Sequence, residues 1–302
     1  MQSLCEPVFC APTLNEVWLS YQTYRELKKT TARDYAKRLR YVEDWRHMPL
    51  DLITRDMIEK RHKEISATGP QNANYVFRVV RALFIFAGCK FDELHGVNPV
   101  RRLSELRAWN KADPAKTSIE LHDLPTFFNA VLMDENDTIR DIHLLWTLSG
   151  LRRNEGSTLT WERINLDAAT LFIPKEIAKN GIALNLPTGK NLTRLLRARR
   201  ADYPDAKWVF EGDSADVSLS ETNKSYQRIA KRSGLKFSPH SLRRTFLTAA
   251  DYCEVPLHIQ KRLVNHKPKD ITELYHCHSV ERLRKPMQEV EDCILGFANV
   301  GF

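Results

Sequence analysis

Apolar residues recur at helical spacing through the first third of the chain. Thr13 can start the first helix, because its hydroxyl and the carboxylate of Glu16 can form a capping box. The apolar stripe of this helix is Leu14, Val17, Trp18, Tyr21 and Tyr24. The same period predicts three further helices, at about residues 31–46, 52–65 and 72–86. This part of the chain is therefore predicted to be helical throughout.

The rest of the chain mixes helical and strand periods. Helices are predicted at 118–132, 139–148, 192–201, 220–233 and again after residue 238. Between residues 161 and 187, short apolar runs are separated by the turn signals Asp167-Ala168-Ala169 and Lys179-Asn180-Gly181. These runs predict a three-stranded antiparallel sheet, so the expected fold is mainly α with a small antiparallel β-sheet.

A polar, proline-containing segment at 109–117 separates the two patterns and indicates an exposed linker. It divides the chain into a helical domain at 13–108 and an α+β domain at 118–290. Residues 1–12 carry two prolines and no period, which indicates a loose lead-in. Residues 291–302 form an apolar tail. The sequence leaves open whether this tail packs on its own domain or docks on a neighbouring protomer.

Composition and charge add a class of partner. A length of 302 residues is enough for two domains, each with its own core. The net charge of +8 suits a polyanion such as nucleic acid, although many basic proteins bind none. No apolar run is long enough to span a membrane, and the first residues lack a signal-peptide pattern. Six scattered cysteines indicate reduced thiols and a cytoplasmic location.

Candidate chemistry is concentrated at residues 237–278. A Ser-Pro pair can start a helix in which His240 and Arg243, three residues apart, share a face. A second helix would deliver His266 at its end, and a third short helix would carry Tyr275. The segment gathers two imidazoles, a guanidinium and a phenol. This set suits a phosphodiester, because it supplies fixed positive charge, a proton acceptor and a hydroxyl that can attack.

These residues carry a family resemblance. His-x-Leu-Arg-Arg-Thr from His240, Leu-x-x-His ending at His266 and Thr-x-x-Tyr ending at Tyr275 resemble the C-terminal signature of tyrosine recombinases, the phage-integrase family. The arginine box of that family is similar to the run Ser-Gly-Leu-Arg-Arg-Asn-Glu at 149–155, and its β-hairpin lysine is similar to Lys179. The resemblance covers most of the second predicted domain and contains every catalytic element in the family's order.

The resemblance implies a site-specific DNA recombinase, an integrase that integrates or excises a mobile element such as a phage. Strands would be cleaved and rejoined through a 3′-phosphotyrosyl intermediate, which conserves the bond energy without ATP. The implied roles are Tyr275 as nucleophile, His240 as proton acceptor, Lys179 as general acid, Arg152 and Arg243 as phosphate clamps, His266 as a further hydrogen-bond donor and Glu155 as their support. No metal or other cofactor is expected, because fixed cationic side chains take the role of Mg²⁺.

The same resemblance implies that the first domain is a core-type DNA-binding domain. Candidate DNA contacts are Arg33, Lys37, Arg40, Arg101, Arg102 and, in the second domain, Arg244. A solvated helix face is the plain alternative for the row at 33–40. The implied partners are double-stranded DNA attachment sites, further copies of the chain in a DNA-bound tetramer, and DNA-bending accessory proteins. No membrane partner is expected.

Competing interpretations remain at this point. A type IB topoisomerase-like enzyme would share the phosphate chemistry, and a catalytically silent DNA-binding regulator would share the fold. Lys175 and Lys190 compete with Lys179 for the role of general acid. A zinc site is a further alternative, although its spacing fits no structural zinc pattern and its ligands would obstruct the nucleophile. The candidate ligands for zinc are His266, His276, Cys277 and His278.

Several positions depart from the family pattern. Gly156 follows the arginine box where an aliphatic residue is common. Asn265 replaces the glycine that usually precedes the histidine of the Leu-x-x-His motif, which is the third box of the family. Arg244 stands where histidine is frequent, and the apolar residues at 182–184 stand where basic ones are common. None of these changes removes a catalytic group.

Overall fold

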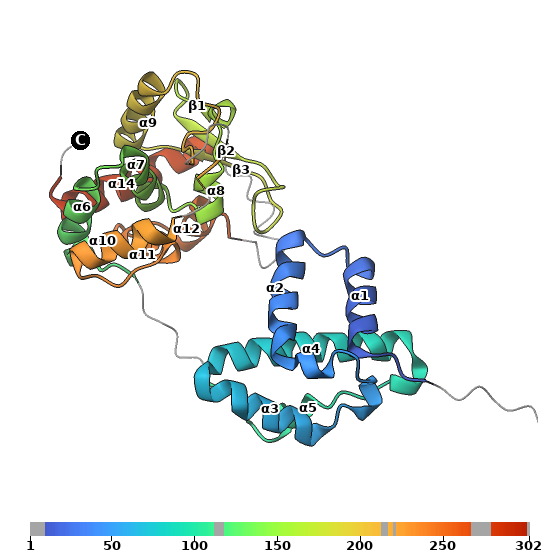
Figure 1. The fold of residues 1–302 in the computed structure, drawn as a ribbon. Coiled ribbons are helices and arrows are strands. Elements are labelled where there is room, and N and C mark those ends of the chain that lie inside the picture. The colour runs from blue at the N-terminus through green and yellow to red at the C-terminus, as the bar shows by residue number, and fades with distance from the viewer. Residues whose placement is uncertain (1–9, 112–117, 213–216, 220–221, 267–278, 301–302) are drawn as a thin grey trace, which may run out of the picture. The chain divides into compact units, whose positions relative to one another are not determined.

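The computed structural model describes residues 10–111, 118–212, 217–219, 222–266 and 279–300 (Figure 1). The chain divides into two compact units, residues 1–114 and 115–302, and the division lies inside the segment expected to be the linker. Each unit has its own hydrophobic core.

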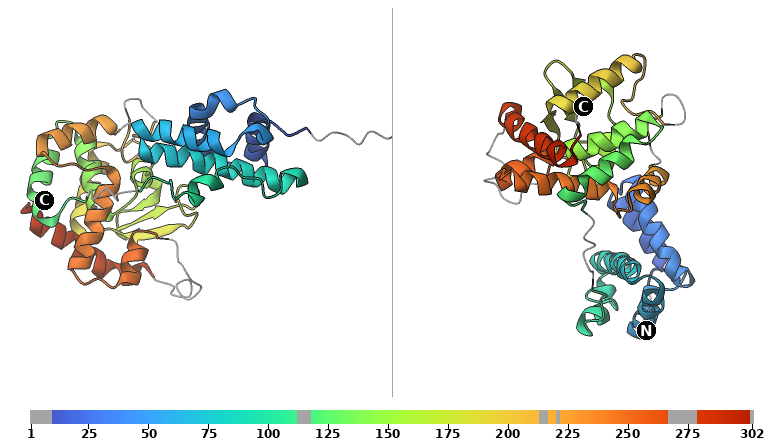
Figure 2. Two further views of the ribbon diagram at one scale, coloured as in Figure 1. Left: turned by 90° about the horizontal axis from the view of Figure 1, so that it is seen from below. Right: turned by 90° about the vertical axis from the view of Figure 1, so that its left-hand side faces the viewer.

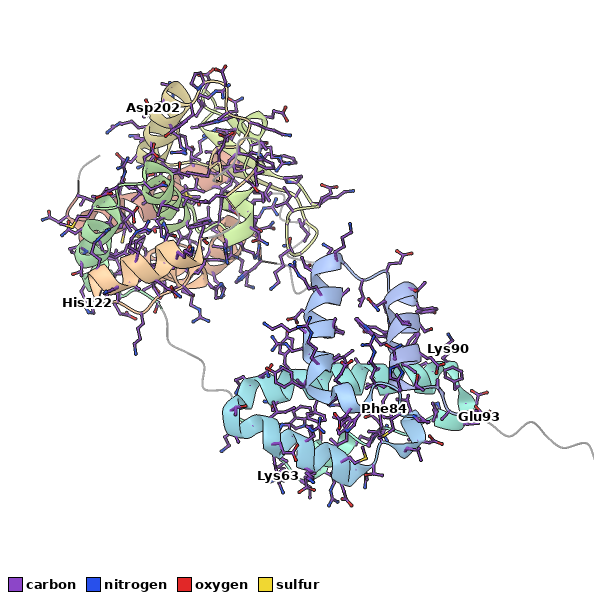
Figure 3. All side chains as sticks on the ribbon, viewed as in Figure 1. Lys63, Phe84, Lys90, Glu93, His122 and Asp202 are labelled. Carbon is purple, nitrogen blue, oxygen red and sulfur yellow. The ribbon has the colours of Figure 1, made fainter. Side chains whose placement is uncertain are left out.

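The first unit is built around one long helix. Its helices are α1 (Leu14–Tyr24), α2 (Lys29–Leu39), α3 (Arg55–Thr68), α4 (Pro70–Lys90) and α5 (Arg101–Glu105). Short 3₁₀ turns lie at Arg40–Trp45, Leu50–Leu52 and Asp92–Leu94. α1 and α2 pack on one side of α4, and α3 packs on the other side with α5 beside it (Figure 1). Phe84 lies on α4 within this core, together with the equally buried Phe77 and Leu83 (Figure 3).

Local chemistry explains where these helices begin and break. The Glu16 amide donates to Thr13 Oγ1 at 3.3 Å and the Thr13 amide donates to the Glu16 carboxylate at 2.8 Å, which is the predicted capping box. The continuous helix predicted at 31–46 is wrong, because α2 ends at Leu39 and Val42 leaves helical geometry. The break places Val42 and Trp45 in the core, and burial of these two side chains offsets the helical hydrogen bonds that are lost.

Hydrogen bonds hold the last described residues of the first unit against its helices. The Asn110 side-chain amide donates to Ser66 Oγ at 2.8 Å and to the Pro70 carbonyl at 2.9 Å, while the Asn110 carbonyl accepts from Asn74 Nδ2 at 2.8 Å. The Trp109 ring lies edge-on to the buried His62. A linker that starts at residue 109 is therefore wrong for these two residues, since both belong to the first unit.

The second unit packs helices against one face of a small sheet, whose other face is exposed at Phe172 and Asn185. Its helices are α6 (Leu124–Leu132), α7 (Asp137–Ser149), α8 (Arg153–Ser157), α9 (Lys190–Asp202), α10 (Asn223–Ser233), α11 (Pro239–Tyr252), α12 (Leu257–Leu263) and α14 (Val280–Ala298), with 3₁₀ turns at Leu121–Asp123 and Trp161–Arg163. The strands β1 (Ile164–Asn165), β2 (Thr170–Ile173) and β3 (Leu184–Pro187) are antiparallel in the order β1-β2-β3 (Figure 2). Leu171 lies opposite both Ile164 and Leu186. The predicted fold class is confirmed.

Two predicted elements differ in detail. β2 and β3 are joined by the ten residues 174–183, so Lys179-Asn180-Gly181 is one turn within a longer loop and not a tight hairpin. The helix predicted from residue 118 begins only at Leu124. The Ile119 amide and carbonyl bond instead to the hydroxyl of Thr245, at 3.0 and 2.9 Å, which holds this segment against α11 in a non-helical conformation.

The last helix continues through the predicted domain end at residue 290. Val290, Ile294 and Ala298 of α14 are buried in the core of the second unit. Glu291 is also buried, and its carboxylate accepts the amides of Asn191 and Leu192 at 2.9 and 2.8 Å, at the start of α9. A separate tail beginning at residue 291 is therefore wrong for 291–298, which pack on their own unit. Among the described residues, no helix is both long and apolar enough to cross a membrane.

Candidate active site

Four segments of the second unit bring the predicted catalytic groups together. Arg152 lies between α7 and α8, Arg243 lies on α11, His266 follows α12, and Lys179 lies on the loop between β2 and β3. α7 ends at Ser149, and the residue that caps it is Gly150, whose φ of +64° favours glycine. A Cβ atom on Gly150 would also stand 2.7 Å from the ring of Phe246 on α11. The arginine box therefore needs glycine both for its backbone conformation and for close packing.

Arg152 is fixed by the carboxylate of Glu155. Its Nη1 atom donates to Glu155 Oε1 at 2.8 Å, and its backbone amide donates to Oε2 at 2.9 Å. Its Nη2 atom donates to the carbonyl of Asn265 at 3.0 Å. Glu155 is almost fully buried, so this carboxylate supports the guanidinium from within the unit and leaves further donors of Arg152 for a ligand.

Arg243 is the buried partner of Arg152. Its Nη1 atom donates to the carbonyl of Gly150 at 2.8 Å, and its Nη2 atom donates to the carbonyl of Val264. Burial, followed by the charge of Arg152, lowers the pKa of Arg243 to about 10. The side chain is therefore still charged at neutral pH. It joins the end of α7 to the end of α12 as well as adding positive charge.

The two histidines lie at the exposed edge of these guanidinium groups. Partial burial, then the charges of Arg244 and Arg243, lower the pKa of His240, and the charges of Lys179 and Arg152 act in the same direction. Partial burial and the charges of Arg243 and Arg152 likewise lower the pKa of His266. Both rings are therefore largely neutral at pH 7, which is the form that can accept a proton.

Lys179 is exposed on a loop whose base is well anchored. Ala178 beside it is fully buried, and the Ala178 amide donates to the Pro174 carbonyl at 3.0 Å. The Gly181 amide donates back to the Ala178 carbonyl at 3.0 Å and closes a turn over Lys179. Lys190 starts α9 just after the far end of β3, so it lies at the opposite end of the sheet from this loop.

Some of the predicted site lies outside the described residues. This is true of the nucleophile Tyr275 and of three of the four zinc candidates, His276, Cys277 and His278. In the part of the chain that the structure does describe, no three His, Cys, Asp or Glu side chains gather as a metal site.

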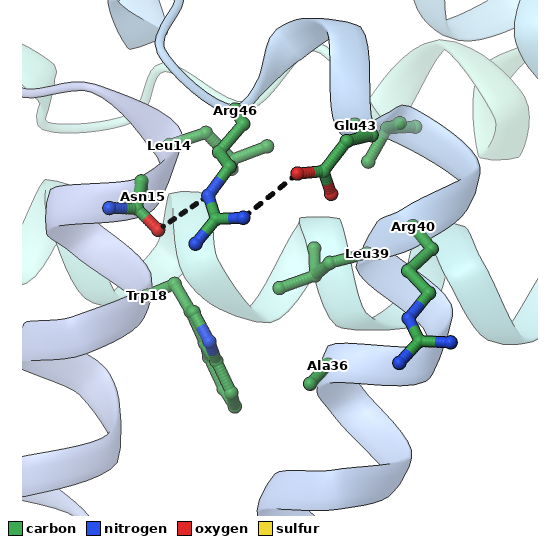
Figure 4. Close-up of a pocket in the computed structure, with 9 residues that line it drawn as sticks. Leu14, Asn15, Trp18, Ala36, Leu39, Arg40, Glu43 and Arg46 are labelled. Atoms are coloured by element: carbon green, nitrogen blue, oxygen red, sulfur yellow. Dashed lines mark hydrogen bonds and ion pairs between the residues drawn. The ribbon is translucent and has the colours of Figure 1, made fainter.

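The candidate DNA contacts of the first unit fall into two groups. Arg33, Lys37 and Arg101 are exposed. Arg40 is exposed as well and lines a cavity of about 430 Å³ between α1 and α2, where Arg46 bridges Asn15 and Glu43 (Figure 4). Arg102 is half-buried, and its Nε atom bonds to Glu59 of α3 at 3.2 Å. This ion pair helps to hold α5 on α3, and the DNA contact of Arg102 stays a prediction. In the second unit, Arg244 lies within the electrostatic reach of His240.

Two asparagines of the site had no role assigned from the sequence. Asn180 and Asn265 connect the lysine loop to the segment that carries His266. The signal that could have found Asn265 was its replacement of a usual glycine. Nothing local to Asn180 distinguishes it from an ordinary turn residue.

This fold, and the two arginines and two histidines that it brings together, agree with the family that the sequence resembles. The phage integrase family model matches residues 120–282, more than half of the chain, and the chain belongs to that family. The prophage integrase IntF of Escherichia coli K12 is 25% identical over 265 residues, covering 84% of this chain and 56% of the relative. The prophage integrase IntZ of the same strain is 28% identical over 257 residues, covering 81% of this chain and 60% of the relative.

The chain thus spans somewhat more than half the length of these two relatives. Among solved structures, a lambda integrase tetramer bound to a Holliday junction superposes with a TM-score of 0.68 at 17% identity, covering 92% of this chain and 78% of that one. This similarity shows that the two proteins share a fold.

Proposed function

We propose that this chain is a site-specific DNA recombinase of the integrase type, which breaks and rejoins DNA through a 3′-phosphotyrosyl intermediate on Tyr275. The observation that carries the proposal is the arginine pair. Arg152 and Arg243 bond to consecutive carbonyl groups, and their charges act on both His240 and His266. Two forked donors and two imidazoles are thereby available to one phosphate group.

In the proposed cleavage step, the phenol oxygen of Tyr275 attacks phosphorus and the bond from phosphorus to the 5′ oxygen breaks. A phenol has a pKa of about 10, so its proton needs an acceptor at neutral pH. His240 fills this role, because its lowered pKa keeps the ring neutral. Lys179 gives a proton to the leaving 5′ oxygen. Rejoining reverses these transfers when the 5′ hydroxyl of another strand attacks the phosphotyrosine.

The remaining groups stabilise the negative charge of the transition state. Arg152 and Arg243 contact the non-bridging oxygens, where charge increases as the fifth bond to phosphorus forms. His266 adds a hydrogen bond to the same phosphate. Glu155 keeps the guanidinium of Arg152 in place. Removal of one such donor typically costs about 10²–10³-fold in rate.

Lys179 is favoured over Lys175 and Lys190 as the general acid because its charge acts on a histidine of the site. Its charge is one of those that lower the pKa of His240. Lys190 lies at the other end of the sheet, and Lys175 lies near the start of the loop, four residues before Lys179. We therefore assign the general acid to Lys179.

The proposed partner is double-stranded DNA carrying an attachment site. Four copies of the chain would act on it together in the cytoplasm, as lambda integrase is a tetramer on a Holliday junction. Arg33, Lys37, Arg40 and Arg101 are proposed phosphate contacts of the first unit. DNA-bending proteins are further candidate partners. Binding is expected to weaken steeply with added salt, because each neutralised phosphate releases counterions.

A nicked suicide substrate tests the proposal. A nick close to the cleavage position in the attachment junction of the mobile element lets the short 5′ fragment diffuse away, so a covalent complex accumulates. We expect this complex to form with the native protein, also in the presence of EDTA, and to be absent with Tyr275→Phe. A covalent complex with Tyr275→Phe would overturn the assignment of the nucleophile. Exchange of strands between two duplexes supports a recombinase, whereas relaxation of supercoils without exchange points to a topoisomerase.

A further inference from the structure

A closed set of hydrogen bonds joins the lysine loop to the third box. Asn180 Nδ2 donates to the Asn265 carbonyl at 2.9 Å and to Asn265 Oδ1 at 3.1 Å. In return, Asn265 Nδ2 donates to the Ile182 carbonyl at 2.9 Å, and the Ile182 amide donates to Asn180 Oδ1 at 3.1 Å. The two asparagines are 85 residues apart in sequence, so these bonds tie together two separate segments.

The Asn265 carbonyl accepts hydrogen bonds both from the lysine loop and from the arginine pair. It accepts from Asn180 and also from Arg152 Nη2, at 3.0 Å. One oxygen atom therefore fixes the guanidinium that would contact the phosphate and the side chain next to Lys179. A shift of the loop would have to break this shared contact.

The backbone at Asn265 explains why its side chain can take part. Its φ is +48°, in the left-handed region where glycine is unstrained and asparagine is among the best tolerated of the other residues. The residue is 2% exposed, so its amide group needs partners within the protein. Asn180 and Ile182 supply them. An asparagine here keeps the backbone conformation that glycine would adopt and adds hydrogen bonds to the loop.

We propose that Asn265 and Asn180 are positioning residues, which hold the loop so that Lys179 reaches the 5′ oxygen of the phosphate clamped by the arginine pair. This inference rests on the proposed function, because it takes Lys179 as the proton donor. Neither asparagine is assigned a contact with DNA. They act through Lys179, so their removal lowers the rate of the step in which the 5′ oxygen leaves.

A substrate with sulfur in place of the bridging 5′ oxygen isolates that step. A thiol has a pKa of about 8.5, far below that of an alcohol, so a thiolate leaves without a proton donor. The phosphorus–sulfur bond breaks, the phosphotyrosine bond forms, and the 5′ product departs as the thiolate. A defect that acts only through proton donation therefore disappears on this substrate, whereas a defect in the arginine clamp or in folding remains.

The experiment measures covalent complex formation in a single turnover on the oxygen and sulfur versions of the suicide substrate. The variants are Asn265→Gly, which keeps the backbone conformation and the carbonyl, Asn180→Ala, and Lys179→Ala as the reference. With oxygen we expect Lys179→Ala to lose about 10²–10⁴-fold and each asparagine variant about 10–100-fold. With sulfur we expect the rates of all three variants to lie within about threefold of the native rate, because the leaving thiolate needs no proton donor.

Controls separate positioning from stability. Arg152→Ala is expected to stay impaired with sulfur, because its defect lies in the clamp. Asn185→Ala changes an exposed asparagine of β3 and is expected to match the native protein on both substrates. The double variant Asn180→Ala with Asn265→Gly is expected to be no slower than the slower single variant, since both break one set of contacts.

Three outcomes overturn the proposal. In the first, Asn265→Gly and Asn180→Ala cleave the oxygen substrate at the native rate. In the second, their defects persist with sulfur while that of Lys179→Ala disappears, which leaves the proposed function intact and removes only the positioning role. In the third, the defect of Lys179→Ala also persists with sulfur. The assignment of Lys179 as general acid then fails, and the positioning role fails with it.

Discussion

Arg152 and Arg243 donate hydrogen bonds to the carbonyl oxygens of two consecutive residues, Asn265 and Val264. This places two guanidinium groups side by side at the end of α12. Their charges repel each other, and the charge of Arg152 adds to burial in lowering the pKa of Arg243. A phosphate between them would relieve this repulsion, most strongly when its own charge is highest. The protein therefore pays the cost of gathering the two charges during folding, before DNA binds.

The forked geometry of Arg152 is expected to be essential. One terminal nitrogen bonds to Glu155 and the other to the Asn265 carbonyl, so Arg152→Lys would have to give up a contact in order to reach the phosphate. We expect single-turnover cleavage to fall by about 10²–10³-fold while DNA affinity changes little. The control is Arg194→Lys, at an exposed position on α9, which should cleave at the native rate. Native-like cleavage by Arg152→Lys would contradict the bidentate role.

The pH dependence of cleavage is expected to report on His240. Its ring accepts a proton only when neutral, and its pKa lies below the ordinary value of 6.5 because of partial burial and then the charge of Arg244. The acid limb of the rate profile should therefore lie below pH 6.5. Arg244→Gln removes a positive charge, which raises the pKa of His240 and moves this limb to higher pH. An unchanged limb in single-turnover profiles of Arg244→Gln would argue against His240 as the acceptor.

Gly150→Ala is expected to destabilise the second unit. The substitution adds a Cβ atom to a residue whose φ is +64°, and this atom would stand 2.7 Å from the Phe246 ring. Backbone strain of about 1–2 kcal/mol and overpacking of about 1–3 kcal/mol should both lower the free energy of unfolding. Gly234→Ala is the matched control, because Gly234 also ends a helix with φ of +71° but a Cβ there would meet nothing within 4 Å. Denaturant unfolding should show a clearly smaller loss for Gly234→Ala.

The buried His143 is expected to make stability depend on pH. Its Nδ1 atom bonds to the Ile139 carbonyl at 2.7 Å, its Nε2 atom has no hydrogen-bond partner among the described residues, and its ring packs on Trp146 and Tyr226. Burial lowers its pKa from 6.5 to about 4. Well above pH 6.5 the ring is neutral in both the folded and the unfolded state, so it adds no pH dependence to the stability. As the pH falls below 6.5, the unfolded state binds a proton that the folded state does not.

The expected loss of unfolding free energy between pH 7 and pH 4 is on the order of 3 kcal/mol from this group. Denaturant titrations of the native protein and of His143→Leu across that range isolate the contribution, since other titrating groups are common to both. As the pH falls, the native protein should lose more unfolding free energy than His143→Leu. Parallel curves would show that His143 does not remain neutral in the folded state.

Much of this protein was accessible from short-range patterns. The capping box at Thr13 and the helix that begins at Pro239 each depend on residues within a few positions of one another. The three strands follow one another within residues 164–187, and the alternation of apolar residues along each strand predicted them. Each of the arginine and histidine boxes is a short run of residues, and the order of these boxes and the lysine along the chain is read directly from the sequence, which is how the family resemblance was found. Such features are local, so the sequence alone contains the information needed to recognise them.

Partners that are distant in sequence were decided only by the tertiary structure. Arg102 bonds to Glu59, Glu291 accepts the first amides of α9, and Asn180 bonds to Asn265. At the level of the sequence and the family resemblance, Arg102 was a candidate DNA contact, Glu291 a tail residue, Asn180 a turn residue and Asn265 a replacement for the family's glycine. Their actual contacts depend on which segments the fold brings together. A hydrogen bond between two segments requires a particular placement of both backbones, and no pattern within either segment specifies that placement.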